Sequence, residues 1–317
     1  MIRSRLLAAL ALTAIALGAC TAARLPVVPG PGSFRQPPSR LSPAFDTTEY
    51  ALAEGGLLHV SVKIPQWPRG RKPAVLQPLE DDLDLLSRGI VVVRFYHNWL
   101  AAFGGTDPGK AERPPNVVGR WMLAAPRPGI VGRGWFGVIR MTATESVPQV
   151  VDLLETIPDV DPARIAIAGS STGGFIALEA LIAEPRLSAA VVRIACGDYH
   201  RFLRSSSLAL ADDPRWLPDG EMQLDADYEQ ELAAQEPIRH ADALPPRPLL
   251  MLNGTADDAI PFSCASRTAE VLEDAYARAG VASHYRFVAY ESLGHHIGHA
   301  TDDESIRWWE RWLLGSE

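Results

Sequence analysis

The sequence predicts an α/β fold in which a mostly parallel sheet carries helices on both faces. Three observations lead to this prediction. The chain has 317 residues and is 47% apolar, which is enough for one large core. Short runs of β-branched residues recur, as at 90–95 and 189–194, and helical patterns separate them. This alternation is typical of strands that are buried on both faces of a parallel sheet.

The individual elements follow from the same patterns. Alternating apolar and polar residues at 58–64 predict a half-buried edge strand, and a helix at 81–88 is closed by Gly89. Further strands are expected at 74–76, 90–95, 164–168, 189–194, 249–252 and 285–288, and further helices at 147–157, 175–183 and 306–314.

Two stretches interrupt this alternation. Residues 104–137 are punctuated by glycine and proline, and we expect them to form a loop that overhangs a functional site. Residues 198–244 are charged and contain tryptophan and proline, and we interpret them as a lid inserted into the domain.

The amino-terminal segment, residues 1–19, has the composition of an export signal. Arg3 and Arg5 precede an apolar run at 6–17, which is shorter than the roughly 20 residues of a membrane-spanning helix. We therefore expect this segment to be a signal peptide that is removed on export.

The four residues at 17–20, Leu-Gly-Ala-Cys, resemble a bacterial lipobox. The resemblance implies cleavage before Cys20 and lipidation of its sulfur, which would make the protein a bacterial cell-envelope lipoprotein that faces the periplasm or the exterior. Ordinary cleavage at Ala19 or Ala23 is the alternative, and it would release a soluble protein.

The rest of the chain divides into a tether and one folded domain. Residues 20–45 contain six prolines and few large apolar residues, so they predict a semi-rigid tether, and residues 46–317 form the domain. The net charge is −8, and Lys and Arg do not cluster after the signal. Nucleic acid is therefore not expected as a partner, and membrane contact is expected through the lipid anchor only.

Two cysteines, Cys196 and Cys264, lie within the predicted domain. An exported protein occupies a compartment in which disulfides persist, so the two residues can form a bridge. Isolated cysteines are also common as small buried apolar side chains. The sequence leaves both alternatives open.

Residues 169–173 read Gly-Ser-Ser-Thr-Gly and fit the pattern G-x-S-x-G. A strand is expected directly before this motif and a helix directly after it. Such a turn needs glycines, because it crowds the backbone around the central residue. Ser171 therefore becomes the candidate nucleophile, whereas Ser170 lies one residue before the apex of the turn. The alternative is a glycine-rich turn that only packs closely.

A serine hydroxyl is a weak nucleophile at neutral pH, so it needs a base, and an acid must orient that base. Residues 253–261 follow the strand at 249–252 and carry two candidate acids, Asp257 and Asp258. The histidines come last in the chain, with His295 directly after Gly294 and with His296 and His299 as its competitors. No histidine or cysteine spacing indicates a zinc site, so no metal is expected.

These motifs resemble those of the α/β-hydrolase superfamily, in which serine, acid and histidine follow in this order. The resemblance covers about residues 57–314. It implies that Ser171 is the nucleophile, that Asp257 rather than Asp258 is the acid, and that His295 is the base, with no cofactor.

The resemblance also implies two backbone N–H donors for the oxyanion of the reaction. Thr172 is expected to supply one. The second is expected from Leu79 or Gln77, but relatives usually carry His-Gly where this chain has Gln77 and Pro78, and proline has no N–H.

Three functions are compatible with these residues. The first is hydrolysis of a small or medium-sized ester through an acyl-enzyme, as in carboxylesterases and dienelactone hydrolases. The second is a peptidase similar to the prolyl oligopeptidase family, which residues 236–238 and 254–258 favour. That family usually has an aromatic residue in place of Thr172 and a β-propeller for which this chain is too short. The third is a non-catalytic, surface-tethered binding protein, against which the complete set of three side chains argues.

Overall fold

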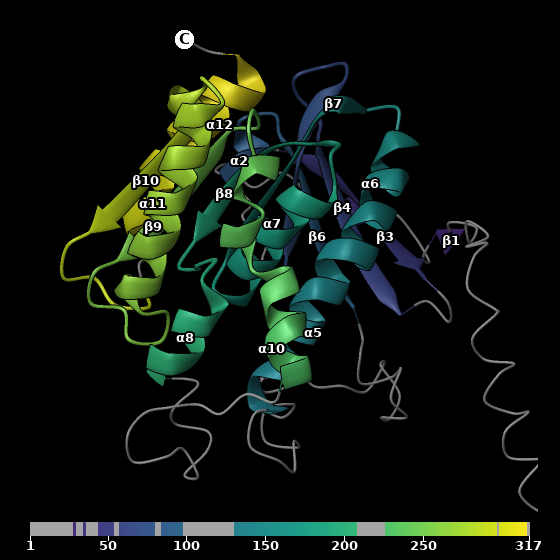
Figure 1. The fold of residues 1–317 in the computed structure, drawn as a ribbon. Helices are drawn as coiled ribbons and strands as arrows, with labels where there is room; N and C mark the ends of the chain where they lie inside the picture. Colours follow the sequence, from purple (N-terminus) through teal and green to yellow (C-terminus); the bar gives the residue numbers. More distant parts are fainter. Residues whose placement is uncertain are drawn as a thin grey trace, which may run out of the picture.

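The computed structural model describes residues 28–29, 34–35, 44–53, 57–79, 84–97, 130–207, 226–296 and 298–315. Their strands are β1 (Val28–Pro29), β2 (Phe34–Arg35), β3 (Phe45–Leu52), β4 (Leu58–Pro65), β5 (Lys72–Pro78), β6 (Val91–His97), β7 (Val160–Ser170), β8 (Leu187–Arg193), β9 (Leu249–Gly254) and β10 (Tyr285–Tyr290). Within these residues the strands form one ten-stranded sheet in the order β1-β3-β4-β6-β5-β7-β8-β9-β10, and β2 also pairs with β3 (Figure 1).

The helices of the described residues are α2 (Asp84–Ser87), α5 (Ile130–Met141), α6 (Val147–Glu155), α7 (Thr172–Ala183), α8 (Tyr199–Ser205), α10 (Ala226–Gln235), α11 (Phe262–Arg278) and α12 (Asp302–Trp309). π-helical turns follow α5 at Thr142–Ser146 and α12 at Glu310–Leu314, and 3-10 turns lie at Pro237–Arg239, Ala241–Ala243, Ala282–His284 and Gly298–Thr301.

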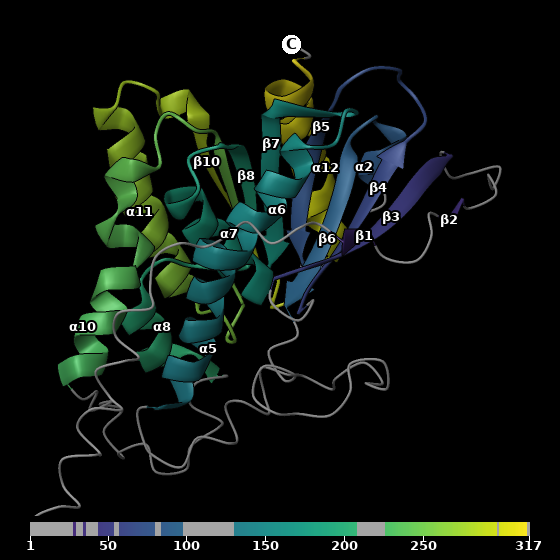
Figure 2. The same cartoon turned by 90° about the vertical axis from the view of Figure 1, so that its right-hand side faces the viewer.

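From β6 to β10 all neighbouring strands run parallel, whereas β1, β2, β3 and β4 join the sheet in antiparallel pairs. Alternate residues of each strand point to opposite faces. In β6, Val91 and Val93 belong to the core formed with α6 and α7, whereas Val92 belongs to the core formed with α2 and α12 (Figure 2). The predicted α/β-hydrolase architecture, with helices on both faces of a mostly parallel sheet, is thus confirmed.

The amino-terminal side of the sheet differs from the sequence prediction. The strand expected at 58–64 as an edge is β4, and β3 pairs along its whole length from Phe45 to Leu52. Two dipeptides from the predicted tether, β1 and β2, pair in turn with β3. The polar positions of β4 therefore face a partly covered side of the sheet rather than marking its edge.

Outside the predicted lid, two helices of the described residues were not expected from the sequence. The loop prediction for 104–137 is wrong from Ile130 onward, because α5 begins there, and residues 104–129 lie outside the described part. Trp135 and Phe136 of α5 pack against Phe175 of α7, and this packing outweighs the low helix propensity of the glycines in α5. Helix α11 follows the acid-bearing segment and carries Leu272 into the core.

The described parts of the predicted lid at 198–244 include α8 and α10, which lie at the end of the sheet where the parallel strands have their carboxyl ends (Figure 1). Residues 208–225 lie outside the description. A disulfide joins Cys196, which precedes α8, to Cys264 in α11. No helix in the described part of the chain is long and apolar enough to cross a membrane.

One carboxyl group is buried between α7 and α8. Glu179 accepts a hydrogen bond from the Tyr199 hydroxyl at 2.5 Å, and both side chains lie in the core. Burial raises the pKa of Glu179 to about 8, although the Tyr199 hydrogen bond and the charge of Arg140 act in the opposite direction.

We therefore expect Glu179 to make the fold less stable as the pH rises. The unfolded chain releases this proton near the ordinary value of 4.5, whereas the folded chain holds it up to about 8, so stability falls between these values and no further above them. Urea unfolding between about pH 5 and pH 8 should show a shallower decline for Glu179→Gln than for the wild type. Equal slopes in the two proteins would contradict this assignment.

Candidate active site

The segment between β7 and α7 turns so sharply that Ser171 adopts a conformation outside the usual regions, with φ 53° and ψ −121°. Its N–H donates to the Arg193 carbonyl of β8 at 3.0 Å, which fixes the turn against the sheet. A Cβ on Gly169 would lie 2.2 Å from the Gly173 carbonyl oxygen, so only glycine allows this close approach. The hydroxyl of Ser171 is therefore held at the carboxyl edge of the sheet.

Three side chains meet at this edge. The Ser171 hydroxyl lies 3.1 Å from Nε2 of His295, and Nδ1 of the same ring lies 3.0 Å from Oδ2 of Asp257. The Asp257 carboxylate has no exposed surface, and its Oδ1 accepts the Ile260 N–H at 2.8 Å. The structure thus brings together the residues that the sequence selects from three distant segments.

Backbone hydrogen bonds hold the loops that carry the acid and the base against each other. The Ala256 N–H donates to the Leu293 carbonyl, and the Thr255 N–H donates to the Tyr290 carbonyl, each at 2.9 Å. A Cβ on Gly254 would come within 2.2 Å of the Leu293 oxygen, so a glycine is needed where the two loops touch. Asp257 and His295 therefore meet because β9 and β10 are parallel neighbours with linked carboxyl ends.

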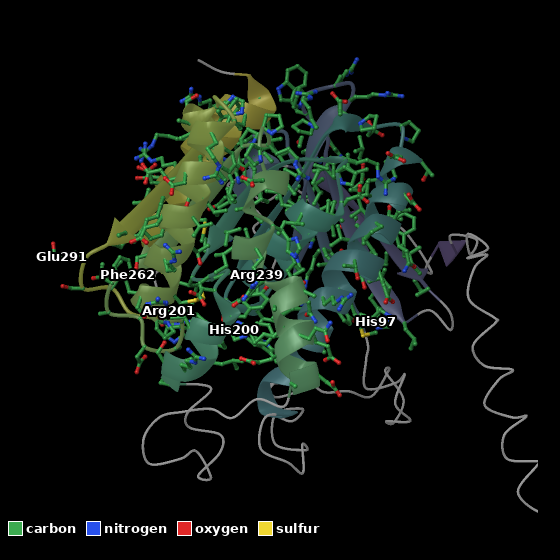
Figure 3. All side chains as sticks on the ribbon, viewed as in Figure 1. His97, His200, Arg201, Arg239, Phe262 and Glu291 are labelled. Carbon is green, nitrogen blue, oxygen red and sulfur yellow. A yellow bond between two sulfur atoms is a disulfide. The ribbon has the colours of Figure 1, made fainter. Side chains whose placement is uncertain are left out.

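The competing side chains are placed differently. Asp258 is exposed, and the structure uses its backbone carbonyl as an acceptor for the Ser207 N–H. His296 is exposed beside His295, with 5.7 Å between the ring centres. Figure 3 shows that His97, the last residue of β6, and Glu291, after β10, lie at the same end of the molecule as His200 and Arg201 of α8.

The two expected oxyanion donors differ in their surroundings. Thr172 is the first residue of α7, where a helix leaves its N–H groups without intrahelical partners. The N–H of Leu79 instead donates to the Phe95 carbonyl at 3.1 Å within the sheet. This bond removes Leu79 as a candidate donor, because its N–H is already used by β6.

Trp135 is a neighbour of the site that the sequence did not single out for this role. Its indole N–H donates to the Thr172 hydroxyl at 3.3 Å, and its ring is only 5% exposed. The ring packs against Phe202 of α8 and Phe175 of α7. The sequence gives no signal for this contact, because Trp135 lies in a segment rich in glycine and such segments usually form loops.

A serine, a histidine and a buried aspartate at the carboxyl edge of a parallel sheet define a serine hydrolase with the α/β-hydrolase fold. A family model described as the prolyl oligopeptidase family matches residues 142–314, more than half of the chain. The chain therefore belongs to the prolyl oligopeptidase family.

Individual relatives include both esterases and peptidases. The chain is 27% identical over 163 residues to YtaP of Bacillus subtilis (strain 168), which is named as a hydrolase, and the match spans about half of each protein. A puromycin-hydrolysing peptidase of Mycobacterium tuberculosis has a TM-score of 0.57 at 20% identity, with 87% of this chain and 44% of that chain covered. Acetyl xylan esterase 1 of Thermoanaerobacterium sp. JW/SL YS485 has a TM-score of 0.57 at 17% identity, with 90% and 89% covered.

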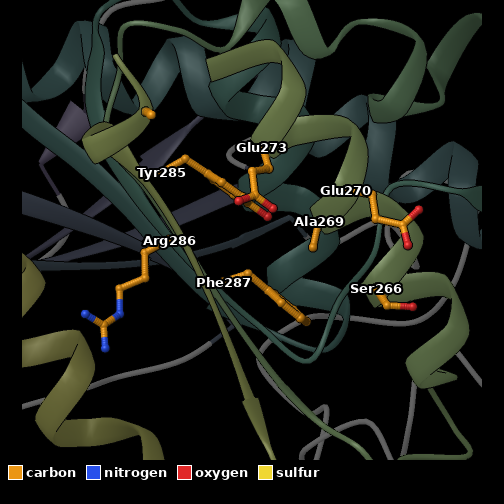
Figure 4. Close-up of a pocket in the computed structure, with 8 residues that line it drawn as sticks. Ser266, Ala269, Glu270, Glu273, Tyr285, Arg286 and Phe287 are labelled. Carbon is orange, nitrogen blue, oxygen red and sulfur yellow. The ribbon is translucent and has the colours of Figure 1, made fainter. Parts of the chain in front are cut away.

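A cleft of about 450 Å³ lies elsewhere, between α11 and β10 (Figure 4). Glu270, Glu273, Tyr285, Arg286 and Phe287 line it together with three small residues. Because none of Ser171, Asp257 and His295 is among these lining residues, we do not assign substrate binding to this cleft.

The close approach at Gly169 predicts a strong effect of a single methyl group. Gly169→Ala must push the Gly173 carbonyl away, so we expect a loss of about 1–3 kcal/mol in stability and at least about a tenfold loss in the kcat/KM of hydrolysis. Thermal unfolding and p-nitrophenyl acetate hydrolysis measure the two effects.

Gly137→Ala is the matched control, because a Cβ there meets nothing within 4 Å and Gly137 lies inside α5. This variant should keep its activity and gain about 0.5–1 kcal/mol in stability from helix propensity. Equal stability and equal activity of the two variants would show that the turn at Gly169 can accommodate a methyl group, contrary to the structure.

Proposed function

We propose that the protein hydrolyses esters of small or medium-sized substrates through an acyl-enzyme on Ser171. The observation that carries this proposal is the unbroken chain of contacts from the Ser171 hydroxyl through His295 to the buried Asp257. An ester substrate is supported by acetyl xylan esterase 1, an esterase that shares the fold over 90% of this chain.

Each residue has a defined part in the proposed reaction. The Ser171 oxygen attacks the ester carbonyl while Nε2 of His295 takes its proton. Asp257 keeps the proton on Nδ1 directed toward itself and stabilises the imidazolium that forms. The Thr172 N–H, at the positive end of α7, faces the negative charge that develops on the carbonyl oxygen.

The second half of the reaction returns the enzyme to its starting state. His295 gives its proton to the leaving alkoxide, so the alcohol departs and the acyl group stays on Ser171. A water molecule then loses a proton to His295 and attacks the acyl carbon. The tetrahedral intermediate then breaks its bond to Ser171 and releases the carboxylic acid, while His295 returns its proton to the Ser171 oxygen.

Ser171→Ala is expected to lower kcat by about 10⁴-fold or more, because it removes the atom that forms the acyl bond. Wild-type protein should react with a fluorophosphonate probe, and the variant should not. Circular dichroism of the variant should match that of the wild type. Labelling that persists in a folded Ser171→Ala protein would assign the nucleophile to another residue.

A peptidase is the second candidate, because the family that matches residues 142–314 is the prolyl oligopeptidase family. A panel of esters and anilides with the same acyl groups separates the two candidates. We expect kcat/KM for the ester to exceed that for the matched anilide by more than about a hundredfold. Anilide cleavage within about tenfold of the ester would favour the peptidase.

We also propose that Cys20 carries a lipid that anchors the exported protein to a bacterial cell envelope, as the lipobox-like residues at 17–20 suggest. Cys20→Ala should then move the protein from the detergent phase to the aqueous phase in phase partitioning. Thr21→Ala, which keeps the cysteine, should partition like the wild type. Unchanged partitioning of Cys20→Ala would reject the anchor.

A further inference from the structure

Helix α8 is attached at its carboxyl end to the segment that carries Asp257, residues 255–261, which we call the acid loop. The Ser206 hydroxyl, which is fully buried, donates to the Ala259 carbonyl at 2.5 Å. The next residue, Ser207, donates its N–H to the Asp258 carbonyl at 2.8 Å. Two consecutive residues of one segment thus bind two consecutive carbonyls of the other.

The segment before α8 is joined to the residues that follow the acid loop. The disulfide between Cys196 and Cys264 connects it to the first turn of α11, three residues after Pro261. The Gly197 N–H also donates to the Thr268 hydroxyl at 2.7 Å in the buried interior. The acid loop is therefore flanked by attachments to both ends of α8.

One peptide group connects Ser206 with the acid itself. The carbonyl that accepts the Ser206 hydroxyl belongs to Ala259, and the N–H of the same planar group belongs to Ile260. That N–H donates to Oδ1 of Asp257 at 2.8 Å. Because the group is rigid, a bond that fixes its carbonyl also fixes its N–H, and it strengthens that N–H as a donor.

We infer that Ser206 is a positioning residue that acts through the Ala259–Ile260 peptide group to hold the Asp257 carboxylate toward His295. The inference rests on the proposed function, since it assigns Ser206 a part in the same proton transfer. Without the hydroxyl, the peptide group can rotate. Oδ1 of Asp257 then loses its fixed N–H donor, whereas Oδ2 is the oxygen that makes the shorter contact with Nδ1 of His295.

The first test measures ester hydrolysis by Ser206→Ala. We expect kcat to fall about three- to tenfold with KM nearly unchanged, because one neutral hydrogen bond that supports the acid is lost. Titration of active sites by the burst of p-nitrophenol should give the same number of competent sites as in the wild type. Ser206→Thr, which keeps a hydroxyl, should restore much of the rate.

Ser188→Ala is the matched control. The Ser188 hydroxyl also donates to a backbone carbonyl, that of Ile165 at 2.9 Å, but it lies at the amino end of β8, away from the carboxyl edge of the sheet that carries the site. Its kcat should stay at the wild-type value. If Ser206→Ala yields too few competent sites, Ser206→Cys keeps the volume with a weaker donor and should have an intermediate kcat per titrated site.

A double-mutant cycle separates positioning of Asp257 from a general effect on the structure. In an Asp257→Ala background, Ser206→Ala should cause no further loss of kcat, since the group through which it acts is gone. An equal loss with and without Asp257, or a wild-type kcat for Ser206→Ala, would overturn the inference. If the wild type itself neither hydrolyses esters nor reacts with the fluorophosphonate, the proposed function fails instead.

Discussion

The turn at Ser171 is the constraint on which the rest of the site depends. A non-glycine residue with a positive φ is strained, and the strain persists only where the surroundings hold it. Here the end of β7 and the first turn of α7 approach so closely that Gly169 has no space for a side chain. Because this turn sets the position of the nucleophile, the loops after β9 and β10 must place the acid and the base beside it.

Backbone hydrogen bonds position most of these two loops. The loops after β9 and β10 are bound to each other through N–H and carbonyl groups, and the Asp257 carboxylate is bound by the Ile260 N–H. Such contacts do not depend on which side chains the loops carry. A site built in this way does not require particular neighbouring side chains, and the fold itself is shared with solved structures at 17% and 20% identity.

Much of this arrangement could be predicted from the sequence, because its signals are local. The strand-turn-helix around Ser171, and the order of the acid and histidine loops behind it, need only short patterns. The availability of the Leu79 N–H is not a local property, because it depends on a neighbouring strand: the Phe95 carbonyl of β6 accepts that N–H. Helix α5 cannot be predicted for a similar reason. Its glycines indicate a loop, and the helix is stabilised by Trp135, which packs against Phe175 and Phe202 from distant segments.

The covalent bond between Cys196 and Cys264 makes the finished fold depend on where the chain matures. Thiols remain reduced in most cytosols, so the bridge forms only in an oxidising compartment. In a reducing cell interior, only noncovalent contacts, among them the Gly197–Thr268 hydrogen bond, would hold the segment before α8 against α11. Recombinant protein made in a reducing and in an oxidising host would thus share one sequence but differ in how firmly the segment after β8 is fastened.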